Sequence, residues 1–160
     1  MLPSTAALGA RAPIQSAILN WLELVAKRVN TGSVLIFDYC SSSTGEISRA
    51  PWREWLRTYK DHGRGEHYLL NPGAQDITTQ VMLDQMLQQF PATSVTSQKA
   101  WLLKWGIEEL VEEGLQFWEE HKHVPNVQAM KMRSRKVESE SLIDDKGLGA
   151  FTAIEIAIEK

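Results

Sequence analysis

The sequence contains one cysteine, Cys40, among its 160 residues. A single thiol cannot form a disulfide within the chain, and it cannot build a thiolate metal cluster. The composition therefore excludes the disulfide-stapled scaffolds and the cysteine-rich zinc modules. A reducing, cytoplasmic setting fits this composition best.

Long apolar runs and an excess of positive charge are also missing. No run approaches the roughly 18 to 20 residues that a transmembrane helix needs, and the N-terminus lacks a basic region followed by an apolar one. We therefore expect no membrane partner and no signal peptide. The 17 Lys and Arg residues are outnumbered by 20 Asp and Glu residues, which gives a formal net charge of -3. This balance argues against bulk attraction to nucleic acid.

Several sequence motifs of catalysis and nucleotide binding are absent as well. The chain has no P-loop, no glycine-rich strand-to-helix turn and no Ser/His/Asp order, so we predict no cofactor-binding residues within it. His62 and His67 straddle two glycines in a spacing that matches no standard zinc site. We predict no metal site, and we interpret these histidines as loop residues that make hydrogen bonds.

The stretch from Gly32 to Tyr39 reads GSVLIFDY and gives the clearest strand signal. Its apolar residues do not alternate with polar ones, which is typical of a strand buried on both faces of a parallel sheet. Ligands of open α/β sheets bind beyond the carboxyl ends of the strands, so Asp38 and Tyr39 are candidate site residues. The alternative is structural, because acidic residues often end strands and tyrosines often cap cores.

The remaining patterns predict an α/β fold with one compact domain, for which 43% hydrophobic residues are sufficient. Helical spacings predict helices over Pro13–Asn30, within Arg49–Gly65, from Asp76–Thr79 onward, and over Gln98–Trp105, Ile107–His123 and Asn126–Leu142. Strands are predicted over Ala92–Ser97 and Phe151–Ile158. The last strand alternates, which favours an antiparallel strand at or near a sheet edge.

The most basic part of the chain lies between residues 49 and 64. Five basic residues recur there every three or four positions: Arg49, Arg53, Arg57, Lys60 and Arg64. Guanidinium groups bind carboxylates and phosphates bidentately, so this stripe could hold either anion. It could equally be the solvated face of a helix whose other face carries Trp52, Trp55 and Tyr59.

Asp76 stands at the predicted start of a helix. A carboxylate there would satisfy free backbone N–H groups and interact favourably with the helix dipole, so Asp76 or Thr78 could be an N-cap. The same geometry could present a general base. Residue spacing alone does not separate these two interpretations.

Four segments, GSVLIFDY, WLRTYKDH, PGAQDIT and SQKAWLLKWGI, occur in this order and resemble the MidA family of S-adenosylmethionine-dependent methyltransferases. Mitochondrial members of that family assist the assembly of respiratory complex I. The resemblance covers nearly the whole chain. It implies the C-terminal part of a class I, Rossmann-like methyltransferase sheet, with strands five, six and seven at Val34–Tyr39, Ala92–Ser97 and Phe151–Ile158. The seventh strand would be antiparallel.

The same resemblance implies one partial methyltransferase domain over residues 1–160. Residues 1–12 would be a flexible N-terminus, 41–75 an insertion on the substrate side, and 98–142 a helical insertion before the last strand. The helix after strand five would cover Asp76–Phe90. In the family, the glycine-rich cofactor loop comes from strands that precede the matched part.

Individual residues match the family's motifs. Asp38 and Tyr39 match an Asp-Tyr-Gly pattern in which Cys40 replaces the glycine. A Leu-Arg-x-Tyr-x-x-His pattern is matched by Leu56, Arg57, Tyr59 and His62. The next block is matched by Pro72, Gly73, Gln75, Asp76, Ile77 and Thr78, whereas Gln80 and Met82 stand where the family usually has histidine and aspartate.

The resemblance implies a function in methyl transfer from S-adenosylmethionine to a protein substrate, with arginine as the acceptor. Catalytic roles would fall to Asp38, Asp76 and His62, and contacts to the substrate to Tyr39, Arg57, Tyr59 and Thr78. The cofactor site would be incomplete here, so a complementary N-terminal half is an expected partner. The rival hypothesis is a non-catalytic interaction module derived from a truncated methyltransferase. A third and weaker hypothesis is nucleic-acid binding through the basic stripe.

Overall fold

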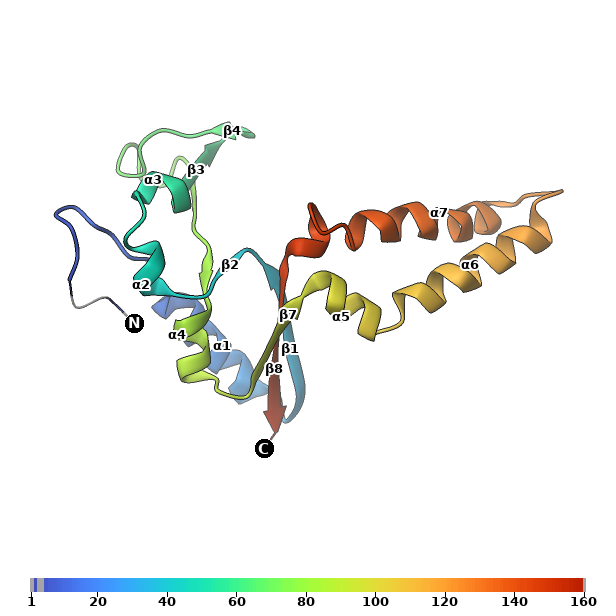
Figure 1. The fold of residues 1–160 in the computed structure, drawn as a ribbon, viewed down its shortest axis with the longest axis horizontal. Coiled ribbons are helices and arrows are strands. Elements are labelled where there is room, and N and C mark those ends of the chain that lie inside the picture. Colours follow the sequence, from blue (N-terminus) through green and yellow to red (C-terminus); the bar gives the residue numbers. More distant parts are fainter. Residues whose placement is uncertain (1, 3–4, 160) are drawn as a thin grey trace. The chain divides into compact units, whose positions relative to one another are not determined.

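A computed structural model of the chain describes residues 2 and 5–159. These residues form two compact units: the first comprises the described residues up to Val34, Asp38–Thr93 and 156–159, and the second comprises Leu35–Phe37 and Ser94–Glu155. Both helices and strands are present, so the predicted α/β class is confirmed (Figure 1). The expectation of one partial methyltransferase domain stays a prediction.

The described strands form three small sheets. One is ordered β1-β8-β7, from Thr31–Asp38, Thr152–Glu159 and Thr93–Ser97. A second pairs β2 (Cys40–Ser41) with β6 (Val81–Met82), in parallel. The third is ordered β4-β3-β5, from Gly63–Arg64, Arg57–Lys60 and Asp76–Thr78.

The strands predicted within Gly32–Tyr39 and over Phe151–Ile158 are present as β1 and β8, but one expected property is wrong. Strand β8 lies between β1 and β7 in the described sheet, next to its edges, and it buries Ala153, Ile154, Ile156 and Ile158. Strand β1 is not buried on both faces, since Leu35 and Phe37 are 36% and 37% exposed. The exposure of successive residues alternates along the second half of β1, although the residues themselves are a continuous apolar run. Among the described strands, β1 pairs only with β8, so its other edge has no paired strand.

Helix α1 (Ser16–Arg28) follows the N-terminal segment of the first unit and buries Leu22. Two short helices, α2 (Thr44–Ile47) and α3 (Trp52–Trp55), come next, and helix α4 (Leu83–Gln89) follows strand β6. A small core forms where Ile47 of α2, Trp55 of α3 and Met82 of β6 pack together. Met82 is fully buried, and its backbone pairs with β2 and with the Gln15 side chain before α1.

Two predicted helices are therefore wrong over part of their length. Helix α3 ends after four residues, and the chain continues as the extended strand β3. In this strand Thr58 is buried, and its hydroxyl donates to the Glu66 carbonyl at 2.7 Å, which stabilises the extended conformation. The helix expected from Asp76 begins only at Leu83. Ile77, Thr78 and Val81 are β-branched, and their backbone pairs with neighbouring strands, so this stretch is extended. Asp76 and Thr78 are consequently not helix caps.

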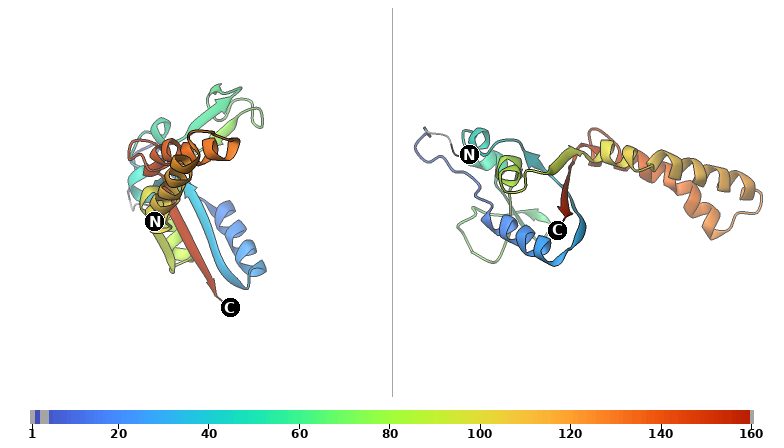
Figure 2. Two further views of the ribbon diagram at one scale, coloured as in Figure 1. Left: turned by 90° about the vertical axis from the view of Figure 1, so that its right-hand side faces the viewer. Right: turned by 90° about the horizontal axis from the view of Figure 1, so that it is seen from below.

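The second unit carries the predicted helices, which are confirmed: α5 (Gln98–Lys104), α6 (Ile107–His121) and α7 (Val127–Leu142), followed by a 3-10 turn, Leu148–Ala150. Ser97 and Asn126 cap α5 and α7 with side-chain oxygens that accept from Ala100 and Ala129 N–H groups. Helices α5 and α6 are separated at Gly106, whose φ of 84° suits glycine. Helices α6 and α7 lie side by side as an antiparallel pair (Figures 1 and 2).

Gly114 on α6 sets the approach of these two helices. A Cβ atom at this position would lie 2.5 Å from the Met132 carbonyl oxygen of α7. We expect Gly114→Ala to destabilise the chain by about 1–2 kcal/mol, although alanine is the better helix former by about 1 kcal/mol. Urea unfolding followed by circular dichroism measures the difference. Glu120→Ala, at an exposed position of the same helix, is the control and should change little; a stabilised Gly114→Ala variant would contradict the close approach.

Candidate functional site

The sheet β4-β3-β5 brings together four of the seven predicted site residues. Arg57 pairs opposite Thr78, and Tyr59 opposite Asp76. Residues two apart on a strand, and residues directly opposite each other on paired strands, project from the same face of a sheet. Arg57, Tyr59, Asp76 and Thr78 therefore share one face, which is polar.

A cross-strand row runs over this face. Tyr59 is opposite Arg64 on one side and opposite Asp76 on the other, so the order is Arg64, Tyr59, Asp76. The Arg64 guanidinium lies 5.4 Å from the centre of the Tyr59 ring, within the range of a cation–π contact. Asp76 is exposed. The row therefore presents a cation, an aromatic ring and a carboxylate in sequence.

His62, predicted as catalytic, lies in the turn between β3 and β4. Lys60 pairs with Gly63, which leaves Asp61 and His62 as a two-residue loop. Both have positive φ, 48° and 63°, as the type I′ turn requires. Glycine or asparagine usually occupies these positions, so the Asp-His pair carries no hairpin signal in the sequence. No described contact joins His62 to Asp76.

The loop that follows β4 is held by Gln75. The Gln75 side chain accepts from the Glu66 N–H at 2.9 Å and donates to the carbonyls of His67 and Leu70 at 3.0 and 2.9 Å. A Cβ atom at Gly65 would lie 2.5 Å from the Gln75 Oε1 atom, so glycine is needed there. Gln75 therefore fixes the loop that leads from β4 to β5.

Asp38 and Tyr39 lie elsewhere, at the junction of β1 and β2. The Tyr39 N–H donates to the Asp38 carboxylate at 2.7 Å, and the Tyr39 carbonyl accepts from Val81 N–H at 2.8 Å. Tyr39 is 58% exposed. Asp38 thus ends one sheet while Asp76 belongs to another, and no described hydrogen bond connects them. The catalytic roles predicted for Asp38, Asp76 and His62 remain predictions.

Residues that the sequence patterns did not single out hold this junction in place. The Gln15 side chain donates to the Gln80 carbonyl at 2.7 Å and accepts from Met82 N–H at 2.8 Å, so it pairs with β6 as a strand would. Gln85 accepts from the Gln15 N–H at 2.9 Å and donates to the Thr44 hydroxyl at 2.8 Å. Two glutamines thereby connect the chain before α1 to β6 and α4. The sequence marks each of these glutamines only as a polar residue within an apolar helical pattern.

Asp84 on α4 anchors the start of α2. Its carboxylate accepts from the Thr44 N–H at 2.9 Å and from the Thr44 hydroxyl at 2.7 Å. Partial burial of the carboxylate opposes ionisation, but the pKa of Asp84 lies below its ordinary value because hydrogen bonds, those from Thr44 among them, favour the charged form. Asp84 is therefore a structural carboxylate and not a proton acceptor near neutral pH.

An aromatic and cationic cluster lies beside the β4-β3-β5 sheet. Trp52 contacts the rings of His67 and Tyr68 edge-on, with centroids 5.0 and 5.1 Å apart. Arg11 donates to the Tyr68 hydroxyl at 2.8 Å and lies 5.3 Å from the centre of the Trp52 ring. Arg11 belongs to the segment expected to be flexible, and its role in this cluster had no signal in the sequence.

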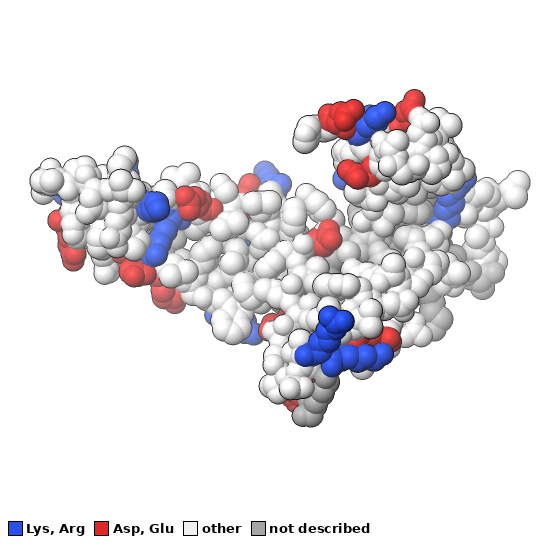
Figure 3. Space-filling view, turned by 180° about the vertical axis from the view of Figure 1, so that it is seen from behind, with Lys and Arg blue, Asp and Glu red and all other residues white. Residues whose placement is uncertain are grey.

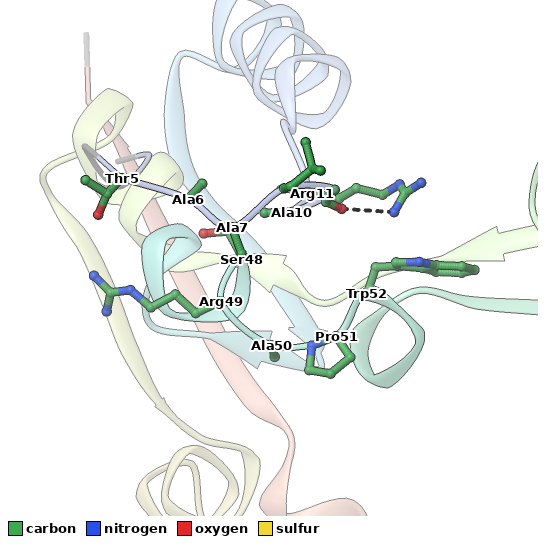
Figure 4. Close-up of a pocket in the computed structure, with 12 residues that line it drawn as sticks. Thr5, Ala6, Ala7, Ala10, Arg11, Ser48, Arg49, Ala50, Pro51 and Trp52 are labelled. Carbon is green, nitrogen blue, oxygen red and sulfur yellow. Dashed lines mark hydrogen bonds between the residues drawn. The ribbon is translucent and has the colours of Figure 1, made fainter.

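One hollow in the described part of the chain lacks the acidic lining that a nucleotide-like methyl donor would need. A hollow of about 480 Å³ lies between residues 5–11 and 48–52, with Ala6, Ala7 and Ala10 on one side (Figure 4). No carboxylate lines it, whereas folds of the Rossmann type hold a cofactor ribose with an acidic residue. Among the described residues there is also no cluster of three His, Cys, Asp or Glu side chains that could hold a metal.

Comparison with known proteins identifies the chain's family. Residues 2–100 match the family described as "Putative S-adenosyl-L-methionine-dependent methyltransferase". The chain belongs to this family. No curated protein matches the sequence. No helix in the described part of the chain has the length and apolar content that crossing a membrane requires.

Two crystal structures of Burkholderia thailandensis proteins are similar to this methyltransferase-family chain. One is the structure of an uncharacterised protein with a TM-score of 0.64 and 20% sequence identity; the match covers 95% of this chain and 42% of the Burkholderia chain. The other is bound to S-adenosyl-homocysteine and has a TM-score of 0.63 and 19% sequence identity; the match covers 92% of this chain and 38% of the Burkholderia chain. The chain thus spans less than half the length of these proteins, and the likeness shows a shared fold.

The contact between Asp84 and Thr44 can be tested through pH. We expect Asp84→Asn to lower the free energy of unfolding near pH 7 by about 1–2 kcal/mol, since an amide cannot accept both bonds from Thr44. The folded chain holds the pKa of Asp84 below 3.8, so this contribution is present above that pH and is lost as the pH falls through the folded value. Urea unfolding at pH 7 and pH 3 measures both stabilities.

The difference between wild type and Asp84→Asn should therefore narrow at the lower pH. Glu46→Gln is the matched control, because Glu46 is exposed in the neighbouring helix α2. An equal loss of stability at both pH values would contradict the role of the charged carboxylate.

Proposed function

We propose that this chain is the acceptor-side portion of a MidA-type, S-adenosylmethionine-dependent methyltransferase that acts on protein arginine in the cytoplasm. Its family and the S-adenosyl-homocysteine held by a similar structure support methyl transfer as the reaction class. The polar face of the β4-β3-β5 sheet is the observation that carries the acceptor side of the proposal.

The sheet order supports the class I, Rossmann-like interpretation. In this proposal β1 is strand five, β7 strand six and β8 strand seven, and the last strand is inserted between the other two. The side of β1 that no described strand covers would pair with strand four. That strand would come from a complementary portion, carried either by the same protein or by a partner chain. Helices α5, α6 and α7 form the helical insertion.

The shared face can position a guanidinium acceptor. The exposed Asp76 carboxylate can accept two parallel hydrogen bonds from the N–H groups of an arginine side chain. These bonds would orient the planar guanidinium group and stabilise the bound arginine. A carboxylate in that position can also take the proton that the acceptor nitrogen releases during methylation. Thr78 and Arg57, paired on adjacent strands, supply further polar contacts to the substrate backbone. S-adenosylmethionine supplies the methyl group when it is bound.

A non-catalytic interaction module is the second candidate. It is favoured because the hollow between residues 5–11 and 48–52 has no carboxylate that could hold a cofactor ribose. In this alternative, the polar sheet and the adjoining Trp52 cluster bind a partner protein, and no methyl group is transferred. The same surface is used in both candidates, so cofactor binding is the property that separates them.

Asp76→Asn tests the acceptor role. With a complementary cofactor-binding portion of the family co-expressed, we expect this variant to lower turnover by about 10²-fold, because the amide orients the acceptor poorly and accepts no proton. Its thermal unfolding should match that of the wild type within about 0.5 kcal/mol, since Asp76 is exposed and caps no helix. Transfer of a radiolabelled methyl group measures turnover. Unchanged turnover, or lost cooperative unfolding, would contradict the assignment.

Titration calorimetry with S-adenosylmethionine separates the enzyme from the interaction module. We expect no detectable binding by the 160-residue chain alone, and binding once the complementary portion is co-expressed. Tight binding by the chain alone would refute the incomplete donor site. Failure of the co-expressed pair to bind the cofactor would favour the interaction module. Thermal unfolding of each sample controls for folding.

A further inference from the structure

A hollow of about 310 Å³ lies beside helix α3 and the hairpin of β3 and β4. Three arginines line it, Arg53, Arg57 and Arg64, and they come from α3, β3 and β4 in turn. They do not form the helical stripe that their spacing predicted, because the chain turns from helix to hairpin between them. The fold instead gathers them around one hollow.

Aromatic rings hold two of these guanidinium groups. The Arg53 guanidinium lies 4.6 Å from the centre of the Trp52 ring, and the Arg64 guanidinium lies 5.4 Å from that of Tyr59. Stacking on a ring face orients a guanidinium plane and leaves its N–H donors available at the edge. None of the three arginines forms an ion pair with a carboxylate among the described residues.

The three guanidinium groups outnumber the carboxylates that line the hollow, so the hollow carries an excess of positive charge. The chain as a whole has a formal net charge of -3, so this concentration of positive charge is local. Guanidinium forks bind a carboxylate bidentately, and Trp52 gives the hollow an apolar wall for a side-chain stem. The hollow is therefore suited to a single carboxylate on an aliphatic stem.

Glu66 also lines the hollow and distinguishes between possible anions. Its carboxylate accepts a hydrogen bond from the Asn71 side chain at 3.0 Å and offsets part of the positive charge of the three arginines. The remaining excess of positive charge is small, which suits one carboxylate better than the closely spaced phosphates of a nucleic acid. A view of one face of the molecule shows small, separate groups of charge among uncharged residues and no continuous basic track (Figure 3). Both features favour a peptide over a polyanion.

We propose that this hollow binds an acidic side chain of a peptide, and that the peptide is the segment that carries the methyl acceptor. The second clause rests on the proposed function; the first does not. Arg64 and Asp76 lie on strands separated by β3, two strand spacings or about 10 Å apart. An extended peptide covers that distance in about three residues. The acceptor segment would thus carry an Asp or Glu about three residues from the methylated side chain.

Calorimetric titration of the 160-residue chain tests the binding site without cofactor. The probe is an acetylated and amidated peptide of alternating Ala and Glu, and the matched peptide carries Gln in place of Glu. We expect the Glu peptide to bind at least about tenfold more tightly, because only its carboxylates pair with the guanidinium groups. Equal binding of the two peptides would overturn the proposal, as would tighter binding of a thymidine oligonucleotide than of the Glu peptide.

Two variants localise the interaction. We expect Arg57→Gln to weaken binding of the Glu peptide about fivefold or more, and Arg57→Gln with Arg64→Gln to abolish it. Arg49→Gln is the control: it removes the same charge nearby, but Arg49 does not line this hollow, and its side chain leaves the backbone away from Trp52 (Figure 4). Thermal unfolding verifies that each variant is folded. Wild-type affinity in Arg57→Gln, or equal losses in Arg49→Gln, would overturn the assignment.

These measurements are independent of methyl transfer. Peptide binding without cofactor binding in any sample would support the hollow while contradicting the proposed enzyme. Methyl transfer that is indifferent to acidic residues in the acceptor, together with no peptide binding, would contradict the hollow alone.

Discussion

Hydrogen bonding around the two-residue strand β6 is the constraint on which the first unit depends. On one side, Val81 N–H donates to the Tyr39 carbonyl, so the end of β1 is tied to the segment that follows Asp76. On the other side, the Gln15 amide bonds to Gln80 and Met82. Buried backbone groups are costly when unpaired, and here a side chain completes what a further strand would supply. A few residues therefore hold in place both the junction at Asp38 and Tyr39 and the segment that follows Asp76.

The candidate site consists of short elements, and this has a physical consequence. Strands of two to four residues cannot form an independently stable sheet, so β3, β4 and β5 rely on contacts outside their own ladder. Gln75 bonds, the buried Thr58 hydroxyl and the Trp52 cluster provide those contacts. The polar face can then remain exposed and unpaired, which is what binding another molecule requires. Of its two arginines, Arg64 lies over the Tyr59 ring, and neither Arg57 nor Arg64 forms an ion pair among the described residues, so their charge is available to a ligand.

Family membership and the geometry of the chain support different parts of the functional account. The matched family is described by methyl transfer from S-adenosylmethionine, while the described β4-β3-β5 sheet presents an exposed polar face with arginine, tyrosine and carboxylate groups. This chain covers less than half the length of each of the two similar crystal structures. The sheet order, with β8 between β1 and β7, is compatible with one side of a larger sheet.

The sequence by itself determined the helices of the second unit, the strands β7 and β8 and the residue types of the candidate site. Helical spacing identified the helices, Gly106 marked the break between α5 and α6, and alternation identified the strands. Local patterns are sufficient there because each of these elements is formed by one continuous segment of the chain. The motif residues Arg57, Tyr59, Asp76 and Thr78 were also identifiable, through resemblance.

Only the tertiary structure decided how those residues are arranged. The same 3- to 4-residue spacing of basic side chains fits a helix, yet residues 57–64 form a hairpin, because a buried Thr58 and a turn with two positive φ angles outweigh helical periodicity. Asp76 starts a strand because its β-branched neighbours pair with β3 and β2. Pairing across more than ten residues of chain is invisible to local pattern, so the shared polar face and the arginine-lined hollow could not be predicted from the sequence.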